Sequence, residues 1–178
     1  MRSLPLLESI ELGSLLGEIL AAHSPQARNR QVRVVLDQPE PSPTVQGSRL
    51  LLRQALSTLV KNAILSTPGG GVVALTARLI GPHVQISVAD AGHGIAPADL
   101  QRILEPGALD ASEDRKDDGI GAGIRLAREI VSRHGGTLTA DSRLGVGTTI
   151  VLQLPVRQNQ LQRELDLPAK GEEAHGIL

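Results

Sequence analysis

The stretch DDGIGAGIRLAREIVSRHGG, residues 117–136, decides the fold of this 178-residue chain. Three alternating glycines, Gly119, Gly121 and Gly123, open a predicted helix, and Gly135 ends it. Glycines let the backbone approach a ligand closely, and the N–H groups of a first helical turn favour an anion such as phosphate. By itself the pattern is weak, because glycines before a helix more often form a plain turn.

Composition predicts one soluble domain. The chain is 40% hydrophobic and 21% charged, with 18 basic and 19 acidic residues that are not segregated into blocks. That balance argues against a nucleic-acid surface or a polybasic membrane anchor. Cysteine is absent, which excludes disulfides and thiolate metal sites and fits a cytoplasmic setting. No apolar run reaches the roughly 18 residues that a membrane span requires.

Aromatic residues are also absent: the chain has no Phe, Tyr or Trp. The volume of the core must therefore come from Leu, Ile, Val and Ala. A ligand that prefers to stack on one of these aromatic side chains will not find one here.

Hydrophobic periodicity predicts an alternation of helices and strands. Helices are expected at 12–23, 48–66, 97–104 and 121–134, and strands at 31–37, 72–79, 83–90, 136–142 and 147–155. A Gly-Pro turn after the strand at 72–79 favours an antiparallel hairpin with the strand at 83–90. Residues 38–47, QPEPSPTVQG, are interpreted as a surface connection. The polar stretch 105–118 lacks periodicity, as functional or disordered loops do.

Two further positions stand out. Asp90 follows a strand in DAGHGI, where its carboxylate can point into a cleft while Gly92 and Gly94 let the chain fold close to a flat ligand. The alternative is an Asx-turn that leaves the strand. Asn62 interrupts the apolar face of the helix at 48–66, where it either faces a cavity or is a buried amide with its hydrogen bonds satisfied.

The order of these motifs resembles the Bergerat ATP-binding fold of gyrase B subunits, ninety-kilodalton heat-shock chaperones, mismatch-repair ATPases and sensor histidine kinases. The likeness is strongest to the catalytic, ATP-binding (HATPase_c) domain of a bacterial histidine kinase. Three segments carry it: SRLLLRQALSTLVKNAILSTPGGGVV, VADAGHGIAPADLQRILEP and GIGAGIRLAREIVSRHGGTLTADSRLGVGTTIVLQLP. The resemblance implies an α/β two-layer sandwich, with a mixed sheet of about five strands covered on one face by three main helices.

The resemblance also implies roles for matching residues. Asn62 corresponds to the asparagine that ligates Mg²⁺, Asp90 to the carboxylate that accepts from the adenine amino group, and Thr148 to the threonine that supports the adenine pocket. The catalytic positions are Thr58, Lys61 and Asn62. The residues expected around Mg-ATP are Asn62, Asp90, Gly92, Gly94, Ile95, Arg115, Lys116, Gly119, Ile120, Gly121, Ala122, Gly123, Ile124 and Thr148.

Several positions depart from the family pattern. Leu104 and Gly107 stand where lid phenylalanines are usual, and Leu65 and Ser66 where a lysine and an aromatic residue are common. Lys61 lies one turn before Leu65 and can replace the lost phosphate contact.

Two further departures concern catalysis and the lid. Thr58 occupies the position of the base, and a hydroxyl is a poor general base. The loop 105–118 corresponds to the lid, where Arg115 and Lys116 either reach the γ-phosphate or are ordinary solvated charges.

The phosphoacceptor side is not found in this chain. Its histidines are His23, His83, His93, His134 and His175, and none is followed by an acidic residue on an amphipathic helix. His93 lies within the glycine turn and His134 at a helix end, so we interpret both as structural. The chain is therefore expected to transfer the γ-phosphoryl group of ATP to a histidine on a dimerisation domain elsewhere, and indirectly to serve a response regulator.

Two other functions stay open: a nucleotide-binding regulatory pseudokinase, and a serine kinase of the anti-sigma-factor type. The expected division of the chain is 1–11 as a linker or remnant of a dimerisation domain, 12–155 as the ATP-binding domain and 156–178 as a tail. No contact with nucleic acid or membrane is expected of this segment.

Overall fold

The computed structural model describes residues 8–105 and 119–156, and the predicted lid and tail lie outside this part of the chain except at their edges. The helices are α1 (Leu12–Asn29), α2 (Arg49–Ser66), α3 (Pro97–Leu104) and α4 (Ile120–Arg133). The strands are β1 (Glu8–Glu11), β2 (Arg33–Asp37), β3 (Thr44–Gly47), β4 (Val72–Ile80), β5 (His83–Asp90), β6 (Thr137–Arg143) and β7 (Gly147–Pro155).

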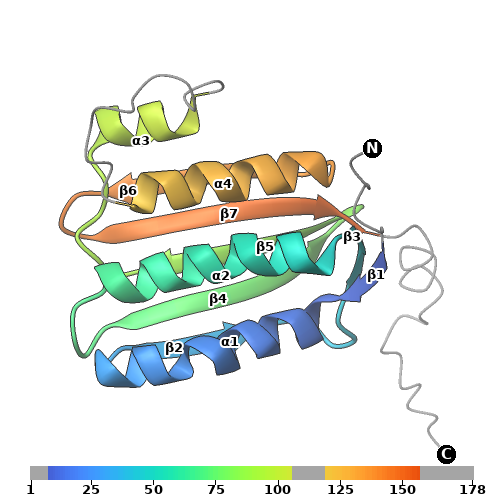
Figure 1. Cartoon of the computed structure of the whole chain (residues 1–178), viewed down its shortest axis with the longest axis horizontal. Helices are drawn as coiled ribbons and strands as arrows, with labels where there is room; N and C mark the ends of the chain where they lie inside the picture. Colours follow the sequence, from blue (N-terminus) through green and yellow to red (C-terminus); the bar gives the residue numbers. More distant parts are fainter. Residues whose placement is uncertain (1–7, 106–118, 157–178) are drawn as a thin grey trace, which may run out of the picture.

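The main sheet has five strands in the order β2-β4-β5-β7-β6. β2 runs parallel to β4, and the other neighbours are antiparallel, so the sheet is mixed. Helices α1, α2 and α4 lie side by side across one face of it, with α3 beyond α4 (Figure 1). The two-layer α/β sandwich that the sequence predicts is confirmed.

The layers pack through aliphatic side chains alone. In β5 the alternation predicted from the sequence places Val84, Ile86 and Val88 in the core. Helix α2 turns a buried stripe toward the sheet that includes Leu56 and Leu59. No aromatic residue exists in the chain, so branched aliphatic side chains supply the packing that large rings often supply elsewhere.

Helix α1 runs further than its periodicity predicts, because it continues through Pro25 to Asn29. A proline inside a helix removes one backbone hydrogen bond, so the sequence favours an earlier end. The last turn is held by tertiary packing, since Ala27 is buried and its carbonyl accepts from the N–H groups of Arg30 and Val32. Packing of this kind often overrides local propensity.

A second, small sheet is not expected from the sequence. β1 pairs antiparallel with β3, so part of the Pro-rich connection forms a strand. Ile10 and Val45 are buried in this pairing, and Val45 also forms a bridge with Val156. Glu11 then caps α1, accepting from the N–H groups at the start of that helix. Residues 8–11 of the predicted linker therefore pack against β3 and the start of α1.

Candidate functional site

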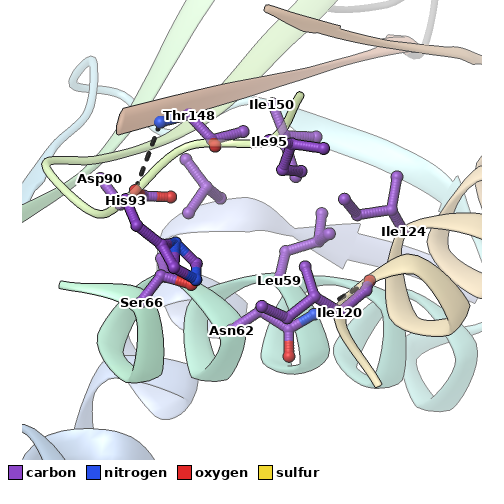
Figure 2. A pocket seen from close by; sticks show the side chains of 12 residues that line it. Leu59, Asn62, Ser66, Asp90, His93, Ile95, Ile120, Ile124, Thr148 and Ile150 are labelled. Atoms are coloured by element: carbon purple, nitrogen blue, oxygen red, sulfur yellow. Dashed lines mark hydrogen bonds between the residues drawn. The ribbon is translucent and has the colours of Figure 1, made fainter. Parts of the chain in front are cut away.

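A hollow opens between α2, the start of α4 and the ends of β5 and β7 (Figure 2). Six of the binding-site residues expected from the sequence line it: Asn62, Asp90, Ile95, Ile120, Ile124 and Thr148. The other lining residues are Leu59, Ala63, Ser66, Val88, His93 and Ile150. The hollow is thus mostly apolar, with an amide, a carboxylate, an imidazole and two hydroxyls on its wall.

Asp90 ends β5 with a half-buried carboxylate. Its Oδ1 accepts from the N–H of Gly92 at 2.8 Å and from the N–H of Thr148 at 3.3 Å. Burial raises the pKa of Asp90, and these two hydrogen bonds and the nearby His93 act in the opposite direction. With Oδ1 held by the backbone, Oδ2 is the oxygen left to accept from a ligand in the hollow.

A hydroxyl network joins the glycine turn after Asp90 to the start of β7. Ser142 Oγ accepts a hydrogen bond from the N–H of Ile95 at 2.8 Å. It also forms a hydrogen bond with Thr148 Oγ1 at 2.8 Å. Ser142 Oγ also donates to the carbonyl of Gly147 at 3.2 Å. These bonds fix Ile95 and Thr148, which both line the hollow, relative to each other.

The turn at Gly94 needs a glycine. Its φ is +72°, and a Cβ there would lie 2.2 Å from the carbonyl oxygen of Arg143. Gly92 is also confined, since a Cβ would lie 2.6 Å from the carbonyl oxygen of Ser66. The sequence suggests that these glycines let the chain approach a ligand. In the structure they let the turn pack against β6 and the end of α2, and that packing sets the shape of the hollow.

We expect Gly94→Ala to lower the free energy of unfolding by about 2 kcal/mol, through left-handed strain and overpacking together. Gly145→Ala is the matched control, because Gly145 has a φ of +75° and open space around it. Its cost should be the backbone strain alone, about 1 kcal/mol. Urea unfolding followed by circular dichroism measures both values. Equal losses for the two variants would show that the contact with Arg143 is unimportant.

Asn62 lies on α2 and faces the first turn of α4. Its Nδ2 donates to the carbonyl of Ile120 at 3.5 Å, a long hydrogen bond. A Cβ on Gly123 would lie 2.7 Å from Nδ2 of Asn62 and 2.7 Å from the Thr58 methyl, so Gly123 allows α4 to pack closely on α2. This contact brings the amide to the helix start that the sequence predicts as a phosphate site.

The start of α4 carries backbone donors and no side-chain cap. Gly119 is the N-cap residue, in a left-handed conformation with a φ of 71°, and it has no side chain to accept from the first turn. Gly121 and Gly123 are buried, whereas Ala122 is exposed. The N–H groups at the start of a helix without a capping side chain attract anions. The end of the hollow nearest Ile120 is therefore suited to negative charge.

Other predicted site residues lie away from the hollow or outside the residues that the structure describes. Lys61 is exposed on α2 and is not part of the lining. Thr58 Oγ1 donates to the carbonyl of Gln54 at 2.8 Å, within its own helix. Arg115 and Lys116 lie outside the described residues, as does Gly107, so their proposed contacts stay predictions.

The family model for histidine kinase-, DNA gyrase B- and HSP90-like ATPases matches residues 47–158. This chain belongs to that ATPase family. The similar curated proteins are histidine kinases. One of them, sensor-like histidine kinase SenX3 of Mycobacterium tuberculosis, is 33% identical to this chain over 153 residues. That match covers 85% of this chain and 37% of SenX3, so the chain spans little more than a third of this relative.

Solved histidine kinase structures share the fold of this ATPase domain. The catalytic domain of histidine kinase ThkA superposes with a TM-score of 0.72 at 22% identity, covering 84% of this chain and 95% of that domain. Full-length ShkA, solved in complex with AMPPNP, has a TM-score of 0.72 at 29% identity. The ShkA match covers 88% of this chain and 32% of ShkA. The predicted resemblance to histidine kinase catalytic domains is confirmed.

The ATPase domain contains functional candidates that sequence reasoning misses. The sequence favours a structural role for His93, yet its ring lines the hollow beside Ser66 (Figure 2). Ser142 is not conspicuous in the sequence, although it joins the two loops of the hollow. No motif marks Ser142, because its importance depends on a pairing between β6 and β7 that brings it opposite Thr148.

The residues present in this ATPase domain fit Mg-ATP. The apolar wall suits a flat base, Asp90 offers one free acceptor at its edge, and the start of α4 offers donors for phosphates. Among residues 8–105 and 119–156, no group of three His, Cys, Asp or Glu side chains could hold a metal. Mg²⁺ commonly binds through one or two protein oxygens together with substrate phosphates, so Asn62 Oδ1 is a sufficient kind of ligand. No described helix is long and apolar enough to span a membrane.

Proposed function

We propose that this domain binds Mg-ATP and donates the γ-phosphoryl group to a histidine on a dimerisation domain outside this chain. One observation carries the proposal. A carboxylate with a single oxygen free for a ligand and the uncapped start of α4 lie on the wall of the same hollow. These groups recognise the two chemically different ends of an adenine nucleotide.

At the base end, Asp90 accepts a hydrogen bond from the adenine amino group through Oδ2. Its other oxygen is held by Gly92 and Thr148, which fixes the direction in which the carboxylate can accept. Leu59, Ile150 and their aliphatic neighbours exclude water from the faces of the base. A half-buried acceptor of this kind discriminates against bases that present an acceptor at the same position.

At the phosphate end, the backbone N–H groups from Gly119 to Gly123 face the negative charge. Asn62 presents its amide oxygen, because its nitrogen is directed to the carbonyl of Ile120. Asn62 Oδ1 would hold Mg²⁺, which when bound would supply positive charge against the negative charge of the phosphates during transfer. The chain's own residues hold and orient the nucleotide, and the attacking nitrogen comes from the partner histidine.

Transfer of label tests the proposal. The chain is incubated with γ-labelled Mg-ATP and separately supplied dimerisation domains, including those of relatives such as SenX3. We expect acid-labile label on the histidine of at least one acceptor. Acid-stable label on serine of a protein partner would support the serine-kinase alternative, which the sensor histidine kinase relatives disfavour. Nucleotide binding with no transfer to any acceptor would contradict kinase activity.

A regulatory, nucleotide-binding pseudokinase is the second candidate, and one observation favours it. The Thr58 hydroxyl, at the position expected for the base, already donates to the carbonyl of Gln54. Lys61 is exposed and lies outside the lining of the hollow. Neither residue is placed to move a proton, so transfer in this domain would depend on positioning and charge neutralisation.

The division of the chain and its location follow from the same proposal. The ATP-binding unit spans residues 12–155, the segment 1–11 leads to the dimerisation domain with its β1 part packed on β3, and residues 156–178 follow as a tail. A response regulator receives the phosphoryl group from the partner histidine. Because the domain consumes ATP, we place it in the cytoplasm.

A further inference from the structure

The hollow has one planar ring on its wall. The chain has no Phe, Tyr or Trp, so histidine supplies every aromatic ring that it contains. His93 is the histidine among the described lining residues, and the remaining lining side chains with apolar surface are aliphatic. A purine in this hollow therefore meets one flat partner.

The His93 ring is exposed and has no hydrogen bond among the described residues. The rings of two other histidines form hydrogen bonds with other elements. His23 Nε2 lies 2.6 Å from Ser57 Oγ, and His134 Nε2 accepts from the N–H of Ser48 at 3.0 Å. These rings hold helices together. The His93 ring, in contrast, makes no such hydrogen bond within the described part of the chain.

The backbone of His93 is held in place although its ring has no described hydrogen bond. Its carbonyl accepts from the N–H of Gly145 at 2.8 Å, which ties the turn to the loop between β6 and β7. The ring lies near Asp90 and beside Ser66, whose short side chain leaves space at the end of α2 (Figure 2). The backbone bond therefore keeps the His93 ring at the mouth of the hollow, in the same glycine turn that follows Asp90.

The hollow is too small for a base as it stands. Its free volume is about 20 Å³, room for about one water molecule. A bound purine needs more space than this, and His93 is an exposed lining residue without a described hydrogen bond to break. A rotation about χ1 moves the ring outward without disturbing the backbone bond to Gly145.

We propose that His93 is the stacking partner of the nucleotide base, its imidazole covering one face of the purine while aliphatic side chains cover the other. This inference rests on the proposed function, because it concerns the same nucleotide. It assigns a positioning role to a residue of the glycine turn whose side chain is otherwise described only as a charge near Asp90. Base stacking on a planar side chain is tolerant of ring identity, since every base has a π-face.

Calorimetric titration of the chain with Mg-ADP tests the proposal through three variants. His93→Ala should weaken binding about tenfold, within the roughly 5- to 150-fold that loss of one stacked base contact produces. His93→Phe should bind close to wild type, because it restores a planar face without any charge. His93→Gln, which keeps polarity but not the ring, should resemble His93→Ala.

Inorganic tripolyphosphate with Mg²⁺ supplies the control ligand. It has no base, so its affinity should be the same in wild type and in all three variants. Unfolding temperatures without ligand should also agree, because the His93 ring is exposed and holds no other element. A fall in tripolyphosphate affinity in His93→Ala would mean a structural or electrostatic role and would overturn stacking.

Proton magnetic resonance gives a direct reading. In deuterated water, once the N–H protons have exchanged, the aromatic region of this chain without Phe, Tyr or Trp contains histidine ring protons and little else. The His93 signals are assigned by their loss in His93→Ala, and ADP should shift them upfield through the ring current of the adenine. Unshifted His93 signals at saturating ADP would overturn the inference.

The remaining outcomes separate this inference from the proposed function. Equal weakening in His93→Ala and His93→Phe would identify His93 as a charge partner of Asp90, not as a stacking face. Unchanged affinity in His93→Ala would also refute stacking, while nucleotide binding itself stands. If wild type binds neither ATP nor ADP, the proposed function fails and this inference fails with it.

Discussion

Replacing Asp90 by asparagine is expected to weaken ATP binding about 100-fold and to remove the preference for ATP over GTP. The reason lies in the two backbone donors at Oδ1. The N–H groups of Gly92 and Thr148 require an acceptor, so the amide oxygen of the variant takes the Oδ1 position. Its NH₂ group then faces the adenine amino group, donor against donor, whereas it could donate to the carbonyl oxygen of guanine.

The same variant should be at least as stable as wild type without nucleotide. Burial raises the pKa of Asp90 in the folded state, so the folded protein holds this proton more tightly than the unfolded chain. Its contribution to stability is complete below the ordinary Asp pKa of about 3.9 and is lost as pH rises through the folded-state pKa. Asp90→Asn should therefore raise the melting temperature near neutral pH, and the gain should disappear in acid.

Asp37→Asn is the matched control for the measurement of nucleotide selectivity. Asp37 is an exposed carboxylate at the end of β2, paired with Arg78, and it is not part of the hollow. Calorimetric titration with ATP and GTP should leave its selectivity unchanged. If Asp90→Asn still chose ATP over GTP as wild type does, the assignment of Asp90 to the base would be wrong.

The site residues that the sequence predicts correctly lie at the ends of helices and strands whose boundaries the sequence pattern shows. Asp90 and Thr148 lie opposite each other in the register of β5 and β7, and both strands show a period of two that fixes where they end or begin. Asn62 is conspicuous because an amide is unexpected on an apolar helical stripe. Motifs at the boundaries of strongly periodic elements can therefore be placed together from the order of residues alone.

The features that sequence reasoning misses depend on contacts between distant segments. β1 pairs with β3, and α1 and β2 lie between them in the sequence. Each of the two strands has only four residues, too few for a hydrophobic pattern that would predict the pairing. Whether His93 is a turn residue or a wall of the hollow depends on how the turn packs against Gly145. Local propensity carries no information on such pairings, because their energy comes from tertiary burial.

The orientation of the Asn62 amide matters for the metal. Its nitrogen is directed to the carbonyl of Ile120, so its oxygen is the atom available to a cation. Gly123 keeps α4 close enough for this arrangement, and a larger residue there would meet the amide. Hard cations such as Mg²⁺ take amide oxygens and phosphate oxygens together.

Asn62→Ala is therefore expected to lower phosphoryl transfer from labelled Mg-ATP at least about 100-fold, since a metal contributes several kcal/mol to such a step. It should also remove the dependence of ADP affinity on Mg²⁺, while ADP affinity in a chelator stays close to wild type. Gln54→Ala, which removes an exposed amide from the same helix, should leave both measurements unchanged. A persistent effect of Mg²⁺ on ADP binding in Asn62→Ala would place the metal elsewhere, because the variant has no side-chain oxygen at this position.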